Sequence, residues 1–433
     1  MPPGKGAIGL SGDTRVIIEG LRSGVPYLEL AREVVLGREG SINNMQRLME
    51  AVEQGRPPRV PAYFFRANYG QGKTHLLYSL RGMAQDRNWV VSLLTLSKET
   101  RLDRLDKIYP KLVAETYIPG SRQPGYEKIV SQALAAPFVL SEVREMGLSP
   151  RVEAVLDNLA SHNVKIEDYA DLLADVRGAF LRVSDVRRIH RQTFGKPLKL
   201  GRSSVRDEIN HYFKLMDWLI HRAGYQGWLI LLDEVELIGK LGRGGRSRAY
   251  AGMGWFMTGV LPRTVTVWAV ASNFESDVLV PRNDREECPA WLAGRPREEA
   301  GAAGCEAAID SLLEAVLLDP LPQQKMQALI GQIAELHQQA YDWQCPFGAT
   351  DLYERVTVLI RTWLTRDAPL RTWVRVTITV LDIWFQYGED PAVSRLEDLV
   401  DATLDEEVAD FGEEADDDTV KSTGPPIVRQ PLF

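Results

Sequence analysis

A chain of 433 residues with 45% hydrophobic and 25% charged residues has the composition of a globular protein of two or three domains. No apolar run approaches the roughly 18–20 residues that a membrane span needs, and the N-terminus lacks an apolar signal core, so we expect a cytoplasmic protein without membrane contact. Three widely spaced cysteines, Cys288, Cys305 and Cys345, indicate neither a disulfide framework nor a zinc site.

The first predicted elements are helices in residues 11–55, ahead of the first strand. The stretch from Arg15 to Pro26 has helical spacing, and Gly24 and Pro26 end the helix. We assign these helices to an N-terminal segment of residues 1–58, after which an α/β core begins.

The segment that follows the first apolar run has the sequence Ala-Asn-Tyr-Gly-Gln-Gly-Lys-Thr and precedes a helical pattern. A strand, a glycine loop, Gly-Lys-Thr and a helix form a phosphate-binding loop, in which backbone N–H groups converge on phosphate oxygens. We expect Lys73 to reach the β- and γ-phosphates of ATP and the Thr74 hydroxyl to hold Mg²⁺. The expected ATP-binding residues are Ala67 (in place of the usual first glycine), Asn68, Tyr69, Gly70, Gln71, Gly72, Lys73, Thr74 and His75.

A second strand is predicted from Val90 to Leu96, and about 130 residues separate it from the next one. A simple crossover needs far fewer, so we expect a helical insertion at about residues 110–225. Between Arg182 and Arg206 the insertion has nine Lys, Arg or His residues and one acid, Asp185. Such a segment can neutralise the phosphates of DNA.

The run Trp-Leu-Ile-Leu-Leu-Asp-Glu at residues 228–234 is apolar up to its two carboxylates. It predicts a strand buried on both faces of a parallel sheet, with the acids at its carboxyl end, where ligands of such sheets bind. Asp233 suits the coordination of Mg²⁺, and Glu234 suits activation of the attacking water. The alternative is a core strand followed by a solvated acidic turn; a phosphate loop upstream makes that alternative weak.

A glycine- and arginine-rich stretch follows, with Lys240, Arg243, Arg246 and Arg248. We interpret it as a flexible loop that contacts DNA, the acidic tail or a neighbouring subunit. The segment 282–304, rich in Pro, Gly and Arg, is an unusual insert.

The apolar run from Thr264 to Asn273 predicts a strand between the two motif strands. Its polar end would contact the γ-phosphate and the water through Asn273, or second through Ser272, unless Asn273 only caps the next turn. Arg282 or Arg285, just after this strand, could act as a finger on a neighbouring subunit in a homo-oligomer.

A short fifth strand is predicted near residues 315–318, and three helices follow it, at residues 323–339, 350–364 and 370–387. The core is thus residues 59–322 and a helical lid is residues 323–395. The tail, residues 396–433, is acidic and expected to be disordered: residues 397–418 hold 12 acids and no Lys or Arg, without which the net charge of −8 becomes +4.

Several segments together resemble the P-loop ATP-binding proteins of BREX phage-defence systems, in particular the small ATPase BrxD. They are Ile-Ile-Glu-Gly-Leu-Arg-Ser-Gly-Val-Pro at residues 17–26, Gly-Lys-Thr-His-Leu-Leu at 72–77, Leu-Ser-Lys-Glu-Thr at 96–100, Leu-Asp-Arg-Leu-Asp-Lys-Ile-Tyr at 102–109 and Leu-Asp-Glu-Val-Glu-Leu at 232–237. The resemblance implies an AAA+-like fold of the origin-recognition type and a helicase partner. Arg371 and Arg375 match a basic position at the start of the lid helix, where Arg371 would sense the γ-phosphate.

Two functions fit these motifs. The first is an ATPase that acts on DNA with a helicase in antiviral defence. The second is a nucleotide-gated scaffold that assembles a defence complex with little hydrolysis.

Overall fold

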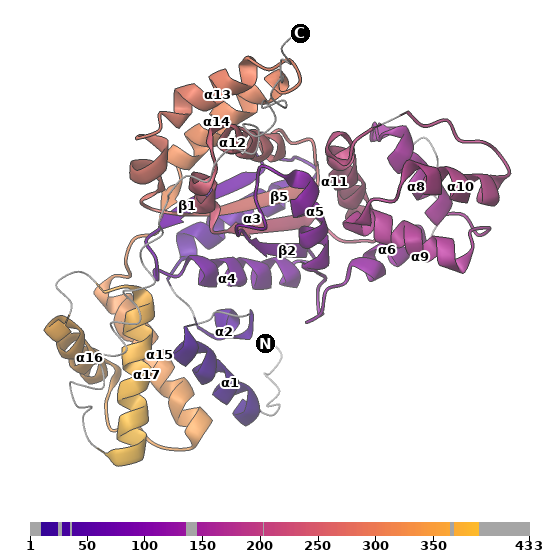
Figure 1. Cartoon of the computed structure of the whole chain (residues 1–433). Coiled ribbons are helices and arrows are strands. Elements are labelled where there is room, and N and C mark those ends of the chain that lie inside the picture. Colours follow the sequence, from indigo (N-terminus) through magenta and orange to yellow (C-terminus); the bar gives the residue numbers. More distant parts are fainter. Residues whose placement is uncertain are drawn as a thin grey trace, which may run out of the picture.

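The computed structural model describes residues 10–24, 28–34, 37–135, 145–201, 203–363 and 368–388. A six-stranded sheet lies at its centre, in the order β3-β2-β4-β5-β1-β6 (Figure 1). The strands are β1 (Ala62–Ala67), β2 (Val90–Thr95), β3 (Thr116–Tyr117), β4 (Trp228–Asp233), β5 (Thr264–Ala271) and β6 (Val316–Leu317). All neighbours pair in parallel except β3, which is antiparallel to β2, so the expected parallel sheet is in fact mixed.

Successive residues of the central strands point to opposite faces of the sheet and therefore pack into two separate hydrophobic cores. Leu229 and Leu231 of β4 pack with α3 (Glu39–Glu53) and α4 (Lys73–Asp86). Ile230 and Leu232 pack on the opposite face. The helices that cover that face include α5 (Leu105–Ala114), α11 (Val205–Arg222), α12 (Arg243–Met257) and α14 (Ala302–Leu313). A strand buried on both sides explains why its sequence is continuously apolar.

The insertion between β2 and β4 is helical, as expected from its length. After α5 and β3 it contains α6 (Tyr126–Leu134), α8 (Pro150–Leu159), α9 (Ile166–Ala174), the π-helical turn η1 (Asp175–Ala179), α10 (Val183–Phe194) and α11. A buried ion pair joins Arg151 of α8 to Asp175 at 2.7 Å, and the Tyr212 hydroxyl of α11 donates to the same carboxylate at 2.5 Å. This polar contact ties three helices of the insertion together.

The glycine- and arginine-rich stretch is not a flexible loop. Residues 235–240 form the 3-10 helix η2 (Val235–Lys240), and Gly244 and Gly245 lie inside α12. A Cβ on Gly244 would lie 2.6 Å from the Trp291 ring, so the small residue permits close packing against α13 (Asp284–Ala293). Arg246 is buried and pairs with Asp284 at 3.0 Å. Arg246 is therefore a core residue that cannot contact DNA.

The segment 282–304 is likewise helical. It comprises α13, the short 3-10 turn η4 (Glu299–Gly301) and the start of α14, after the π-helical turn η3 (Glu275–Leu279). Gly254 of α12 meets Gly304 of α14 so closely that a Cβ on Gly254 would lie 2.1 Å from the Gly304 carbonyl oxygen. The glycines of this region therefore serve helix packing instead of loop flexibility.

The C-terminal helices are α15 (Gln323–Tyr341), α16 (Ala349–Trp363) and α17 (Leu370–Tyr387), near the expected bounds. Two N-terminal helices, α1 (Leu10–Ser23) and α2 (Leu28–Glu33), contribute to the same apolar cluster, at the lower left of Figure 1. The third, α3, packs on the sheet instead. The described helices of residues 1–58 therefore divide between the C-terminal helical cluster, which α1 and α2 join, and the sheet, on which α3 packs. The acidic tail lies outside the described residues, and none of the described helices is long and apolar enough to cross a membrane.

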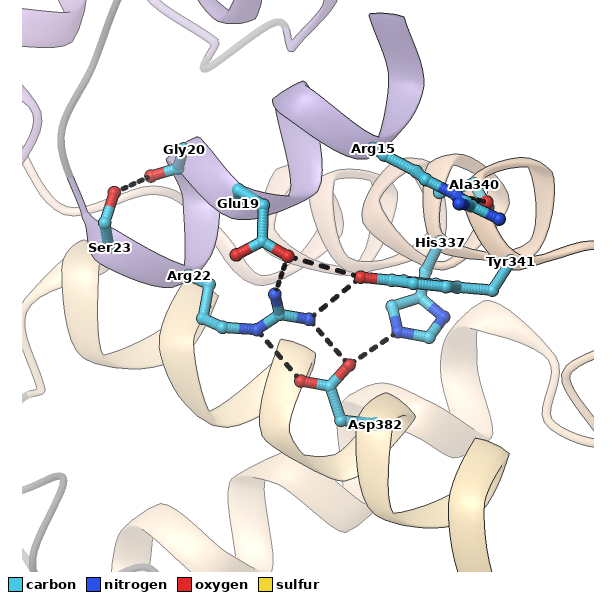
Figure 2. Close-up of polar contacts among 9 residues, drawn as sticks. All are labelled: Arg15, Glu19, Gly20, Arg22, Ser23, His337, Ala340, Tyr341 and Asp382. Carbon is cyan, nitrogen blue, oxygen red and sulfur yellow. Dashed lines mark hydrogen bonds and ion pairs between the residues drawn. The ribbon is translucent and has the colours of Figure 1, made fainter. Parts of the chain in front are cut away.

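A polar cluster joins α1 to α15 and α17 (Figure 2). Arg22 donates to both carboxylate oxygens of Asp382, at 2.8 and 3.1 Å. The buried His337 ring contacts the same carboxylate at 3.0 Å through Nε2. Because the Trp343 indole N–H can only donate, and it lies 2.8 Å from His337 Nδ1, that nitrogen is the acceptor and Nε2–H donates to Asp382. Burial opposes the charge of Asp382, but bonds from His337 and Arg22 hold its pKa below the ordinary 3.8.

We predict that Asp382→Asn lowers the free energy of unfolding by about 1–3 kcal/mol, because Arg22 and His337 lose a charged acceptor. Urea titration measures the change. Asp86→Asn, at an exposed ion pair with Arg32, should cost less than about 1 kcal/mol. The folded-state pKa of Asp382 is depressed, so its contribution is present above pH 3.8 and lost as the pH falls through the folded value. A cost that persists unchanged in acid would contradict this assignment.

Candidate nucleotide-binding site

The glycine loop lies between the end of β1 and the start of α4. Gly70 and Gly72 have φ of +71° and +88°, in the left-handed region that favours glycine. Gly72 is also the residue just before the first helical residue, Lys73. The loop therefore presents the N-terminus of α4 at the carboxyl edge of the sheet, the geometry expected for a phosphate site.

Lys73 is buried, and its ammonium group has a partner that the sequence analysis did not assign. Its Nζ lies 3.6 Å from Oε1 of Glu236, which is itself 5% exposed. Nζ also donates a long hydrogen bond of 3.4 Å to the Ala67 carbonyl oxygen. The available signal was Glu236 itself, the second acid after β4, which the sequence places in a possible solvated turn; in the fold it is buried.

Thr74 and Asp233 meet as the sequence predicts. The Thr74 hydroxyl donates to Asp233 Oδ2 at 2.6 Å, and Asp233 is almost fully buried. One hydroxyl and one carboxylate at this spacing supply hard oxygen ligands, which suit Mg²⁺. The second carboxylate oxygen accepts from the Glu234 N–H at 3.0 Å, which orients the group. These residues therefore fit the metal ion.

Glu234 lines the cavity beside the loop and has an unusual backbone, with φ of +58°. Burial, together with the negative charges of Glu236 and Asp233, raises its pKa to about 7. A carboxyl group with a pKa near neutrality is suited to proton exchange with water.

At the polar end of β5, the side chain of Asn273 does not contact the glycine loop. Asn273 is exposed and donates to Asp277 at 2.7 Å, as a cap of the next turn would. Ser272, the second candidate, donates from its hydroxyl to Asn68 Oδ1 of the glycine loop. Ser272, the first residue after β5, is therefore the candidate whose side chain contacts the loop.

Arg371, at the start of α17, is about 300 residues from the glycine loop in sequence but contacts it directly. Its Nη1 donates to the Tyr69 hydroxyl at 2.7 Å, and its backbone N–H donates to the Gly70 carbonyl oxygen at 3.0 Å. Its guanidinium also lies 4.8 Å from the centre of the Tyr69 ring. Arg375, one turn later, donates to the Ser23 carbonyl oxygen instead. The lid therefore brings Arg371, and not Arg375, to the loop.

A cavity opens between the loop and these helices. Its lining includes Leu21 and Leu30 of the N-terminal helices and Val374 of α17, besides Lys73 and Arg371. His75 also lines it, but its Nε2 faces the Val34 carbonyl oxygen at 3.2 Å, and burial lowers its pKa to about 4. The ring is therefore neutral.

Arg38 is a second residue that the sequence did not single out. It donates to the carbonyl oxygens of Gln71 at 3.0 Å and Asp319 at 2.6 Å. Arg38 therefore links the glycine loop to the segment just after β6. The two finger candidates are engaged within the chain: Arg282 donates to Gly239 O at 2.6 Å, and Arg285 pairs with Asp310 at 2.9 Å.

The basic segment of the insertion surrounds α10. Val186 and Ile189 are buried, while Arg187, Arg188 and Arg191 are exposed on the opposite face. Arg188 pairs with Asp168 at 2.9 Å, and Arg187 donates to the Leu200 carbonyl oxygen. Of the nine basic residues, Arg202 lies outside the described residues.

A mostly parallel α/β sheet with a glycine loop and a buried acid at the facing strand end is consistent with the P-loop class of nucleotide-binding proteins. The family model for the BREX system ATP-binding protein BrxC/D matches residues 11–180 and 201–395. The chain therefore belongs to this family, which implies ATP binding and a role in a phage-defence system. Comparison with curated proteins gives no match. The basic helix α10 falls between the two matched ranges.

We predict that Arg371→Ala reduces the preference for ATP over ADP by about 10-fold or more, since a charge-assisted hydrogen bond to the γ-phosphate is worth about 1.5–3 kcal/mol. The ratio of the two dissociation constants, measured by calorimetry, reports this preference. Arg375→Ala is the matched control and should leave the ratio unchanged. Equal ratios in all three proteins would remove Arg371 from the site.

Proposed function

We propose that the protein binds ATP with Mg²⁺ at this cavity and hydrolyses it. The observation that supports this proposal best is the convergence of Lys73, the Thr74–Asp233 pair and Glu234 at one edge of the sheet. An ammonium group, a hydroxyl and two carboxyl groups meet there, although Thr74 and Asp233 are 159 residues apart in the sequence.

Each residue then has a distinct role. The backbone of the glycine loop would hold the phosphates, and Lys73 would offset charge on the transferring group. Thr74 and Asp233 would hold Mg²⁺, which supplies further charge neutralisation when bound. Glu234 would position the attacking water and accept its proton.

The lid and β5 complete the proposed site. Arg371 would exchange its Tyr69 contact for the γ-phosphate, because a phosphate is a stronger acceptor than a neutral hydroxyl. Ser272 or Asn273 would contact the same phosphate from β5. An arginine finger from a second subunit, Arg282 or Arg285, remains part of the proposal for a homo-oligomer and would require release from its present contact.

The proposed setting is an AAA+-like ATPase that acts on DNA together with a helicase of the defence system. The exposed arginines of α10 support the DNA part, because they give one helix face a positive charge. A nucleotide-gated scaffold is the second candidate. It is favoured by the closed contacts of Arg371 with Tyr69 and of Lys73 with Glu236, since a bound nucleotide would have to rearrange both.

We predict that Glu234→Gln retains ATP binding but lowers turnover by about 10²–10⁴-fold, the usual range for losing a general base. Lys73→Ala should lose binding itself. Phosphate release and calorimetry with the same protein samples measure the two effects. Glu299→Gln, an equal charge change on the exposed turn η4, should behave as the parent. If Glu234→Gln hydrolyses ATP at the parent rate, another group activates the attacking water. If the parent protein binds ATP but does not hydrolyse it, the nucleotide-gated scaffold is favoured.

We predict that binding to duplex DNA falls steeply with salt, with a slope of roughly −0.9 per phosphate neutralised. Replacing Arg187, Arg188 and Arg191 by Ala should flatten the slope by about 2–3 units if each arginine contacts one phosphate. Salt-titrated fluorescence anisotropy with ATP present gives the slope. The matched control carries Ala at three exposed arginines outside the insertion: Arg56, Arg295 and Arg297. No binding by the parent at low salt would exclude the DNA contact.

A further inference from the structure

Glu236 connects three parts of the site that are distant in sequence. Its Oε1 lies 3.6 Å from Lys73 Nζ on the glycine loop. Its Oε2 accepts a 3.0 Å hydrogen bond from the N–H of Ala271, the last residue of β5. Glu234, in the left-handed backbone region, makes the turn between β4 and η2. After this turn the Glu236 side chain points toward the end of β5.

The ion pair between Glu236 and Lys73 places two charges where water hardly reaches them. The two side chains are only 7% and 6% exposed, so water cannot compensate either charge. A buried ammonium group without a counter-ion is strongly unfavourable, and Glu236 is a counter-ion that the chain itself provides for Lys73. The bond to Ala271 holds the carboxylate in place, so it would stay close to Lys73 when phosphates arrive.

We propose that Glu236 is a positioning residue that competes with the phosphates of the nucleotide for Lys73 and thereby limits nucleotide affinity. This inference rests on the proposed function. Phosphate binding would require Lys73 to exchange a carboxylate for a phosphate oxygen, and the remaining carboxylate would repel the new anion. Loss of the γ-phosphate would let Lys73 return to Glu236, which favours release of ADP.

Glu236 is not interchangeable with the acids beside it. Asp233 is engaged with Thr74, and Glu234 faces the cavity. A purely structural role would predict that loss of the Glu236 charge weakens nucleotide binding, because the loop would lose support. Competition predicts the opposite sign, so the two roles can be separated by one measurement.

The test uses Glu236→Gln in the full chain, because the amide oxygen can still accept the Ala271 N–H bond. Calorimetry with MgADP and with a non-hydrolysable ATP analogue plus Mg²⁺ should show tighter binding by at least about fivefold, the lower end of usual coupling between competing interactions. In steady-state assays KM should fall while kcat does not rise. Glu236→Asp, which keeps the charge on a shorter side chain, should give an intermediate affinity and serves if the Gln variant folds poorly.

Glu275→Gln is the matched control, because it removes one negative charge near the same end of the sheet, at an ion pair with Arg66. It should bind nucleotide as the parent does. In a Lys73→Met background, Glu236→Gln should not tighten any residual binding. A parent that binds no nucleotide overturns the proposed function and this inference with it. A parent that binds, with a folded Glu236→Gln variant that binds no more tightly, overturns this inference alone.

Discussion

The parallel pairing of β4 with β5, and of β5 with β1, is the constraint on which the candidate site depends. These pairs place Leu232 beside Trp268 and Ala67 beside Ala271, so the carboxyl ends of three strands reach one edge of the sheet. The glycine loop, the acids after β4 and the polar end of β5 all follow those ends. A shift of one residue in any pair would turn side chains to the other face and separate them.

The charged side chains at this edge of the sheet are paired with one another because they are buried. Lys73, Asp233 and Glu236 are almost inaccessible to water, and Glu234 lines the cavity next to them. Each buried charge needs a partner within a few ångströms, which explains the Thr74–Asp233 and Lys73–Glu236 contacts. A phosphate chain is a strong competitor for these partners. These contacts hold the side chains in place, and an anion that binds beside them would change the balance of charge.

The lid is coupled to the N-terminus as well as to the loop. The helices α1, α15 and α17 share one apolar cluster and the Arg22–Asp382–His337 contacts. Because Arg371 is on α17, movement of this unit would carry the arginine with it. The same unit supplies Leu21, Leu370 and Val374 to the wall of the cavity. Packing far from the loop thus determines where the arginine lies.

The motifs by themselves indicated the parallel central strands, the place of the glycine loop and the pairing of Thr74 with Asp233, because long apolar runs with polar ends allow few alternatives. They did not indicate that β3 joins the sheet antiparallel to β2. Local patterns were insufficient elsewhere. The glycines and arginines of residues 243–248 are typical of a loop, yet helix packing against Trp291 and the buried Asp284 partner of Arg246 make them part of α12. The sequence favours Asn273 over Ser272 at the end of β5, but the turn after β5 pairs Asn273 with Asp277 and leaves Ser272 in contact with Asn68. Glu236 as the counter-ion of Lys73, and Arg371 as the neighbour of Tyr69, were decided by tertiary structure, since burial and contacts between distant segments are properties of the folded chain.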